Sequence, residues 1–146
     1  MKKERQYATL AEINAYRDKI FNDDLSKQEW KTLEERENMV DELNEMYKRL
    51  MPEVGMGATE LLWSDRRAMT VVEVVTPNRV VVRENETICK DWYNSDYEIL
   101  DTLSNMPEHT FTRRKSGRWV EMGQPDKHTS VSLVLGTRYH YIDPSF

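Results

Sequence analysis

The chain has 146 residues, a formal net charge of −5 at pH 7 and a single cysteine, Cys89. This length predicts one domain with room for a buried core. The acidic balance excludes the strong positive excess typical of proteins that bind long nucleic acids. One cysteine excludes an internal disulfide and indicates a reducing cytosol. No apolar run approaches the roughly 18 residues of a transmembrane helix. The first residues, MKKERQYATL, lack the apolar stretch of a secretory signal. We therefore expect a cytoplasmic protein with no membrane partner.

Residues 1–53 have the pattern of a helical arm. Two capping boxes, Thr9 with Glu12 and Ser26 with Glu29, predict two helix starts, and Asn22-Asp23-Asp24 separates the helices. Apolar residues recur at helical spacing at Leu10, Ile13, Tyr16, Ile20 and Phe21, and then, between about Lys27 and Leu50, at Trp30, Leu33, Val40, Leu43, Tyr47 and Leu50. The second stripe is narrow and flanked by charges. It fits helices packed on the rest of the chain and equally an arm packed against other copies.

Residues 54–146 have the pattern of an antiparallel sheet. Residues 59–63 alternate toward a strand, and clearer strands are predicted at residues 68–75, 79–83, 110–115, 119–122 and 130–135. Residues 84–107 are polar and are predicted to be irregular. The expected fold class is therefore α+β, with an N-terminal helical pair followed by an antiparallel sheet of about five strands.

A basic and aromatic cluster stands out on this acidic chain. It comprises Arg113, Arg114, Lys115, Arg118 and Trp119, with the turn dipeptide Ser116-Gly117 between them. The pattern predicts a β-hairpin tip with the basic residues on its flanks. Guanidinium groups bind phosphate oxygens in pairs of hydrogen bonds, so the cluster indicates a compact anionic partner. A solvated hairpin whose charges only keep the sheet edge soluble remains the alternative.

Two further segments carry arginines near predicted turns. In Ser64-Asp65-Arg66-Arg67, Asp65 either forms a self-contained ion pair with Arg66 or orients it toward a phosphate or a ribose hydroxyl. Arg138 follows Gly136 after the last predicted strand. Convergence of these arginines with the hairpin cluster predicts a pocket for a diphosphate-bearing small ligand.

No catalytic set is recognisable, and no pattern calls for a metal or a cofactor. His109, His128 and His140 are scattered, without the spacing of zinc ligands. His140 between two tyrosines is a candidate general base, although such a histidine is more commonly a strand residue with a satisfied ring. Spacing alone therefore predicts no enzyme.

Taken in order, these motifs resemble the phage-encoded Thoeris anti-defence 1 family over about residues 54–146. The resemblance rests on Ser64-Asp65-Arg66, the β-branched residues 70–74, Phe111-Thr112, Arg114-Lys115-Ser116-Gly117-Arg118-Trp119, Gly136-Thr137-Arg138 and the terminal Tyr141-Ile142-Asp143-Pro144-Ser145-Phe146. The chain departs from the family pattern at Arg67, Ser116 and Pro144, where the family commonly has His, Asn and an aromatic residue.

The resemblance implies a small phage protein without catalytic activity that acts in the host cytoplasm. Members of the family capture the glycocyclic ADP-ribose signal of the Thoeris defence system, and some also hold cyclic oligonucleotide signals. They assemble as hexamers with ligand pockets where subunits meet. Carried onto this chain, the ligand-binding residues are Asp65, Arg66, Phe111, Arg114, Ser116, Trp119 and Arg138. On this hypothesis the arginines neutralise a diphosphate, and Phe111 or Trp119 stacks on a base.

Two other function classes remain open. One is a protein–protein inhibitor or virion component that makes contact through the acidic helical arm. The other is an enzyme that cleaves a nucleotide signal with His140 or His128 as its base.

Overall fold

The computed structural model describes residues 7–21 and 33–144. The predicted Ser26–Glu29 capping box, the Asn22-Asp23-Asp24 break, Trp30 and the terminal Ser145-Phe146 lie outside these residues. The chain divides into two compact units, Met1–Met51 and Pro52–Phe146. The division falls two residues before the predicted boundary between residues 53 and 54.

The N-terminal unit contains two helices in its described part, α1 (Leu10–Phe21) and α2 (Leu33–Lys48). The predicted capping box at the start of α1 is confirmed. The Thr9 amide donates to Glu12 Oε1 at 2.9 Å, and the Glu12 amide donates to Thr9 Oγ1 at 3.1 Å. This exchange satisfies two donors that a helix start leaves without partners. Apolar residues of the predicted stripes are buried between the helices, including Ile13, Ile20 and Leu43.

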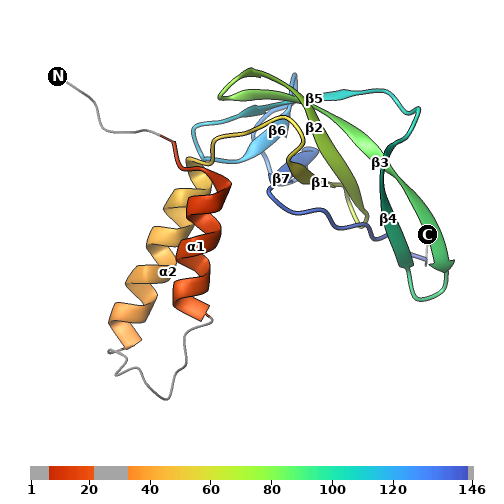
Figure 1. The fold of residues 1–146 in the computed structure, drawn as a ribbon. Helices are drawn as coiled ribbons and strands as arrows, with labels where there is room; N and C mark the ends of the chain where they lie inside the picture. The colour runs from red at the N-terminus through yellow and green to blue at the C-terminus, as the bar shows by residue number, and fades with distance from the viewer. Residues whose placement is uncertain (1–6, 22–32, 145–146) are drawn as a thin grey trace. The chain divides into compact units, whose positions relative to one another are not determined.

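The C-terminal unit is a closed antiparallel barrel with one added strand (Figure 1). Its described strands are β1 (Gly57–Leu61), β2 (Arg66–Thr76), β3 (Arg79–Asp91), β4 (Asp96–Leu103), β5 (His109–Arg113), β6 (Trp119–Glu121) and β7 (Ser132–Leu135). Six strands follow the order β2-β1-β7-β6-β5-β3, and pairing of β3 back to β2 closes the ring. The α+β class with helices before strands is confirmed. The predicted count of about five strands was too low, because the described part has seven.

The strand that was not predicted is β4, which pairs with the second half of the long strand β3. The first half of β3, up to Glu84, pairs with β2 and β5 inside the barrel, whereas residues 85–91 pair only with β4. The hairpin of β3 and β4 extends beyond the barrel in Figure 1. Residues 84–107 were predicted to be irregular, which was wrong for most of their length. Most of this hairpin is exposed on both faces. Its sequence therefore lacks the alternation of apolar and polar residues by which a half-buried strand is recognised.

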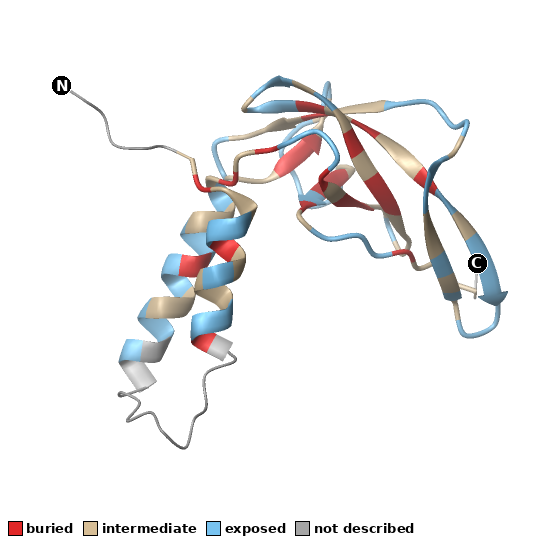
Figure 2. Cartoon of the chain, in the orientation of Figure 1, coloured by how far each residue is buried: buried red, intermediate tan, exposed pale blue. Residues whose placement is uncertain are grey.

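Residues that face the barrel interior form its core (Figure 2). The buried apolar set is Ala58, Met69, Val71, Val80, Val82, Phe111, Trp119, Leu133 and Leu135. Directly paired residues of antiparallel strands point to the same face, and the register joins these residues in pairs such as Val80 with Phe111 and Trp119 with Leu133. One barrel therefore buries side chains from all six of its strands.

No helix among the described residues combines the length and the apolar character needed to cross a membrane.

Candidate functional site

A tight loop between β1 and β2 presents the most exposed large apolar side chain of the described residues. The Leu62 amide donates to the Asp65 carbonyl at 3.0 Å, which leaves Trp63 and Ser64 at the tip of the loop. Trp63 is 85% exposed. Exposure of a large apolar indole to water is unfavourable. A flat aromatic face at a loop tip is suited to stacking on a ligand.

Backbone carbonyls of the same loop hold Arg66. Its Nη1 donates to the Leu62 carbonyl at 3.1 Å and to the Asp65 carbonyl at 2.9 Å. The Asp65 carboxylate has a different partner, since its Oδ1 accepts the Asp143 amide at 2.9 Å. Neither predicted arrangement of Asp65 and Arg66 is therefore found. The backbone orients the guanidinium, and Asp65 attaches the C-terminal segment to the loop.

Trp63 and Arg66 line a pocket of about 730 Å³. That volume lies within the range of about 300–1,000 Å³ that is common for small-ligand sites. The pocket is on the outer face of the barrel, because it is lined by Leu61 and Ser132, which alternate with the inward-facing Glu60 and Leu133.

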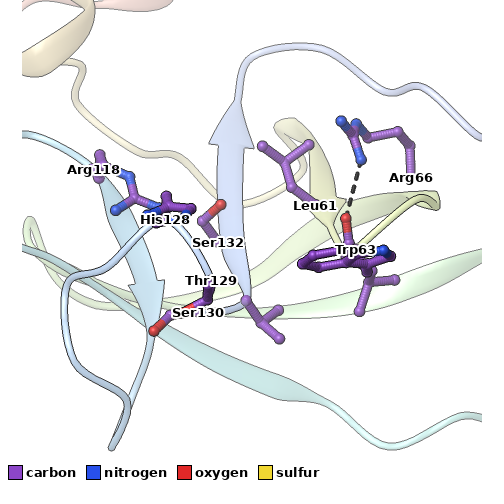
Figure 3. A pocket seen from close by; sticks show the side chains of 10 residues that line it. Leu61, Trp63, Arg66, Arg118, His128, Thr129, Ser130 and Ser132 are labelled. Atoms are coloured by element: carbon purple, nitrogen blue, oxygen red, sulfur yellow. Dashed lines mark hydrogen bonds between the residues drawn. The ribbon is translucent and has the colours of Figure 1, made fainter.

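The opposite side of the pocket supplies a second cation and several polar groups. Figure 3 shows Arg118 and His128 on one side of Ser132, and Trp63 with Arg66 on the other. Thr129 and Ser130 of the β6–β7 loop complete this side. Arg66 at the start of β2 and Arg118 in the loop between β5 and β6 therefore line one cavity, together with hydroxyl groups and an exposed indole. This combination of groups suits an anionic ligand that carries a flat ring.

Arg118 is held by the loop that follows β6. Its Nη1 donates to Asp126 Oδ1 at 2.8 Å, and Ser116 Oγ donates to Asp126 Oδ2 at 2.7 Å. The predicted site residue Ser116 therefore lies next to the pocket through Asp126, although it does not line the pocket itself. Arg118 belongs to the predicted basic cluster, but sequence reasoning did not select it as a site residue.

Arg138 lies away from this pocket. Its Nη2 donates to Thr70 Oγ1 at 3.0 Å, and its Nε donates to the Met69 carbonyl at 3.3 Å. Thr70 is four residues from Arg66 along β2, a separation of roughly 13 Å at the usual rise of a strand. A single chain therefore does not bring Arg66 and Arg138 into one cleft. The expected convergence of the three arginines is not found within one chain, and their meeting across copies of the chain stays a prediction.

Arg114 binds its own hairpin. Its Nε donates to Thr112 Oγ1 at 2.8 Å, and its Nη2 donates to the Glu121 carbonyl at 3.0 Å. The basic residues were predicted on the strands that flank the turn. Arg114 and Lys115 lie instead in the loop between β5 and β6. Arg114 does not line the pocket described above.

The two aromatic residues predicted to stack on a base are both in the barrel core. Phe111 is fully buried, and Trp119 is 4% exposed with the Arg113 guanidinium 4.7 Å from its ring centroid. Neither ring presents a face at the surface of the single chain, so the burial does not support the predicted stacking, which stays a prediction. The β-hairpin spacing placed both rings correctly on strands, but the closure of the barrel decided that they point inward. Trp63 takes the exposed position, directly before the Ser64-Asp65-Arg66 motif.

The barrel interior also contains an ionisable cluster. Glu60, Arg67, Glu84, His109 and Glu121 come from five strands, and the register pairs each of them with another member or with a core residue. His109 Nδ1 lies 3.4 Å from Glu60 Oε2 and 3.4 Å from Glu121 Oε2. Burial raises the pKa of Glu60, while His109 and Arg67 oppose the rise. With three carboxyl groups against one arginine, this cluster does not suit an anionic ligand.

Glu60→Gln is expected to change the pH dependence of stability. Because the pKa of Glu60 is raised in the folded state, the folded protein binds this proton more readily than the unfolded chain. Its contribution to the free energy of unfolding is therefore present at pH values below the unfolded pKa and is lost as pH rises through the folded pKa. Each pKa unit of difference is worth about 1.4 kcal/mol.

Thermal unfolding at pH 4 and pH 8 measures this effect. At each pH, the melting temperature of the Gln variant is compared with that of the original chain. This difference should favour the variant more at pH 8 than at pH 4. Glu73→Gln removes an exposed carboxylate of β2 and should leave the profile parallel to the original. Parallel profiles for the Glu60 variant as well would contradict the role of burial.

His140 packs within the C-terminal unit. It is buried, its Nδ1 accepts the Ala68 amide at 3.4 Å, and its ring meets the edge of Tyr97 at 4.8 Å between centroids. Burial lowers the pKa of His140, and Arg67 adds to this effect. The ring is thus satisfied, as predicted, but His140 lies in the segment after β7 and not in a strand. Within residues 7–21 and 33–144, no three His, Cys, Asp or Glu side chains are placed to hold a metal ion.

Comparison of the chain with protein-family models, curated proteins and solved structures found no match. The Trp63 pocket and the motifs in the sequence are therefore the features of this chain that bear on its function.

Proposed function

We propose that this chain is a phage anti-defence protein that captures a cyclic nucleotide immune signal without cleaving it. The signal is glycocyclic ADP-ribose or a related cyclic oligonucleotide, and its capture in the host cytoplasm prevents activation of the Thoeris effector. We also propose that the protein works as a homo-oligomer, a hexamer by analogy with the family that its motifs resemble.

The observation that carries the proposal is the pocket that is lined by the exposed Trp63 and by two arginines, Arg66 and Arg118. Cyclic nucleotides combine phosphates with flat bases, and both features have a counterpart here. Stacking on an aromatic ring contributes about 1–3 kcal/mol per base. Charge-assisted hydrogen bonds contribute about 1.5–3 kcal/mol each. Stacking together with bonds from two arginines approaches the roughly 8 kcal/mol of a micromolar complex.

Arg66 supports this assignment because its orientation is set before any ligand arrives. The two loop carbonyls hold the guanidinium through Nη1, so little side-chain freedom remains to be lost on binding. Capture requires tight binding and no chemistry, and the described lining offers cations, hydroxyl groups and one histidine, His128. A pocket of this composition is suited to holding a phosphorylated ligand.

The test is to incubate the purified protein with glycocyclic ADP-ribose, remove free ligand by filtration, and then denature the protein by heat. We expect the signal to disappear from the filtrate and to return intact after heating. A signal that returns as a cleaved product would instead support the hydrolase alternative. A signal that stays in the filtrate would contradict capture of this ligand, and the same assay with cyclic oligonucleotides would then decide the ligand class.

The protein–protein alternative is favoured by one observation, the exposed aromatic tip of the β3–β4 hairpin. Trp92 and Tyr93 are 52% and 79% exposed. For this alternative we propose a contact surface on the barrel unit rather than on the helical arm. Loss of effector inhibition in a Trp92→Ser, Tyr93→Ser double variant that still captures the signal would favour this alternative.

A further inference from the structure

One of the two arginines of the pocket, Arg118, already forms an ion pair with a carboxylate of the same chain, Asp126. Asp126 accepts from Arg118 Nη1 at 2.8 Å through Oδ1, and from Ser116 Oγ at 2.7 Å through Oδ2. The side chains of Arg118 and Asp126 are 37% and 29% exposed. Both carboxylate oxygens therefore have partners, and the charge of Arg118 is balanced before any ligand binds.

A phosphate that binds Arg118 must come close to this carboxylate. The remaining donors of the guanidinium lie within a few ångströms of Nη1, so the two anions face each other across one planar group. Their repulsion grows with the charge on the phosphate. A phosphodiester carries one negative charge, whereas a terminal phosphate monoester carries nearly two at neutral pH.

We propose that Asp126 makes this pocket select phosphodiesters over phosphate monoesters. The inference rests on the proposed function, because it assumes that a nucleotide phosphate binds at Arg118. Asp126 is a specificity-determining residue that acts by repulsion, and such repulsive elements commonly set specificity. Cyclic signals contain no terminal phosphate, whereas abundant mononucleotides and nucleotide triphosphates do. The carboxylate would thus keep the pocket free of common nucleotides.

Asp126→Asn tests the inference, with AMP and 3′,5′-cyclic AMP as probes. These probes share base and ribose and differ in the charge of their single phosphate. The Asn side chain retains an oxygen that can accept from Arg118, so the loop after β6 should keep its shape, which a melting curve checks. Titration calorimetry at pH 8 and low salt measures both affinities.

We expect the gain in affinity of the variant over the original chain to be about 4-fold to 16-fold larger for AMP than for cyclic AMP, as the one extra unit charge of AMP near 5 Å predicts at a dielectric constant of roughly 40–80. Cyclic AMP should gain clearly less. The matched control is Asp101→Asn, which removes the same charge from an exposed position on β4, outside the pocket lining. It should change neither affinity.

No gain for AMP in the Asp126 variant, or an equal gain for both probes, would overturn the inference. The proposed function fails separately, when neither the original chain nor the Asp126 variant takes up the cyclic immune signals. A gain for AMP in that case would leave Asp126 as the filter of an anion site with a different ligand. Arg118→Ala combined with Asp126→Asn should abolish the gain, which ties the effect to this pair.

Discussion

Arg66→Ala is expected to weaken capture of the cyclic nucleotide signal about 10- to 100-fold, which corresponds to the loss of charge-assisted hydrogen bonds worth about 1.5–3 kcal/mol. Arg66 lines the pocket, and its Nη1 is held by the carbonyls of Leu62 and Asp65. Arg66→Lys keeps the charge but loses the planar fork, so it should recover only part of the affinity. Equilibrium dialysis with labelled signal measures all three proteins.

Arg138→Ala is the matched control for this prediction. Arg138 bonds to Thr70 and to the Met69 carbonyl, outside the pocket. Its loss should lower the melting temperature slightly and leave capture unchanged. Equal loss of capture in the Arg66 and Arg138 variants would show that the two side chains meet across copies of the chain, and the pocket of a single chain would then be an incomplete site.

Phe111→Ala is expected to destabilise the barrel by about 3–5 kcal/mol, the usual cost of removing a large aromatic side chain from a core. Phe111 is fully buried and pairs directly with Val80 on β3 and Glu121 on β6. The loss includes both the transfer energy of the ring and the cavity it leaves, because three neighbouring strands cannot close over the space. Urea unfolding of the two proteins measures the difference.

Phe111→Leu separates packing from ligand contact. A substitution that nearly conserves volume in a core commonly costs less than about 1.5 kcal/mol. The Leu variant should therefore fold and capture the signal as well as the original chain. If Phe111 instead stacked on a base, the Leu variant would fold but lose capture. That result would restore the assignment of Phe111 as a ligand-binding residue.

In the basic hairpin, the local sequence pattern predicted the turn and the strands but not the contacts of the arginines. Ser116-Gly117 predicted a turn, and Gly117 adopts a φ of 92°, which suits glycine. Strands β5 and β6 flank it near the predicted positions. The use of each arginine was not predictable, because it depends on carbonyls and carboxylates from distant segments. Arg113, for example, bonds to Asn78 and Pro77 in the turn between β2 and β3.

In the β3–β4 hairpin, by contrast, the local sequence pattern did not predict the strands. Its strands are stabilised by pairing with each other and by the buried Asn85, whose Oδ1 accepts from Thr70 Oγ1 and whose Nδ2 donates to the Leu100 carbonyl. Neither contact leaves a periodic apolar signal. Sequence periodicity reports burial of one face, and a hairpin with exposed faces has little of it.

The amino-acid sequence by itself determined the elements that depend on neighbours in the chain. These are the Thr9–Glu12 capping box, the change from helical to strand pattern near Pro52, and most of the barrel strands. Only the tertiary structure decided which side chains reach a ligand. Closure of the barrel turned Phe111 and Trp119 inward and brought Trp63, Arg66 and Arg118 to one outer pocket. The physical reason is that a strand's alternation fixes two faces, but which of them is buried depends on pairing between strands far apart in the chain.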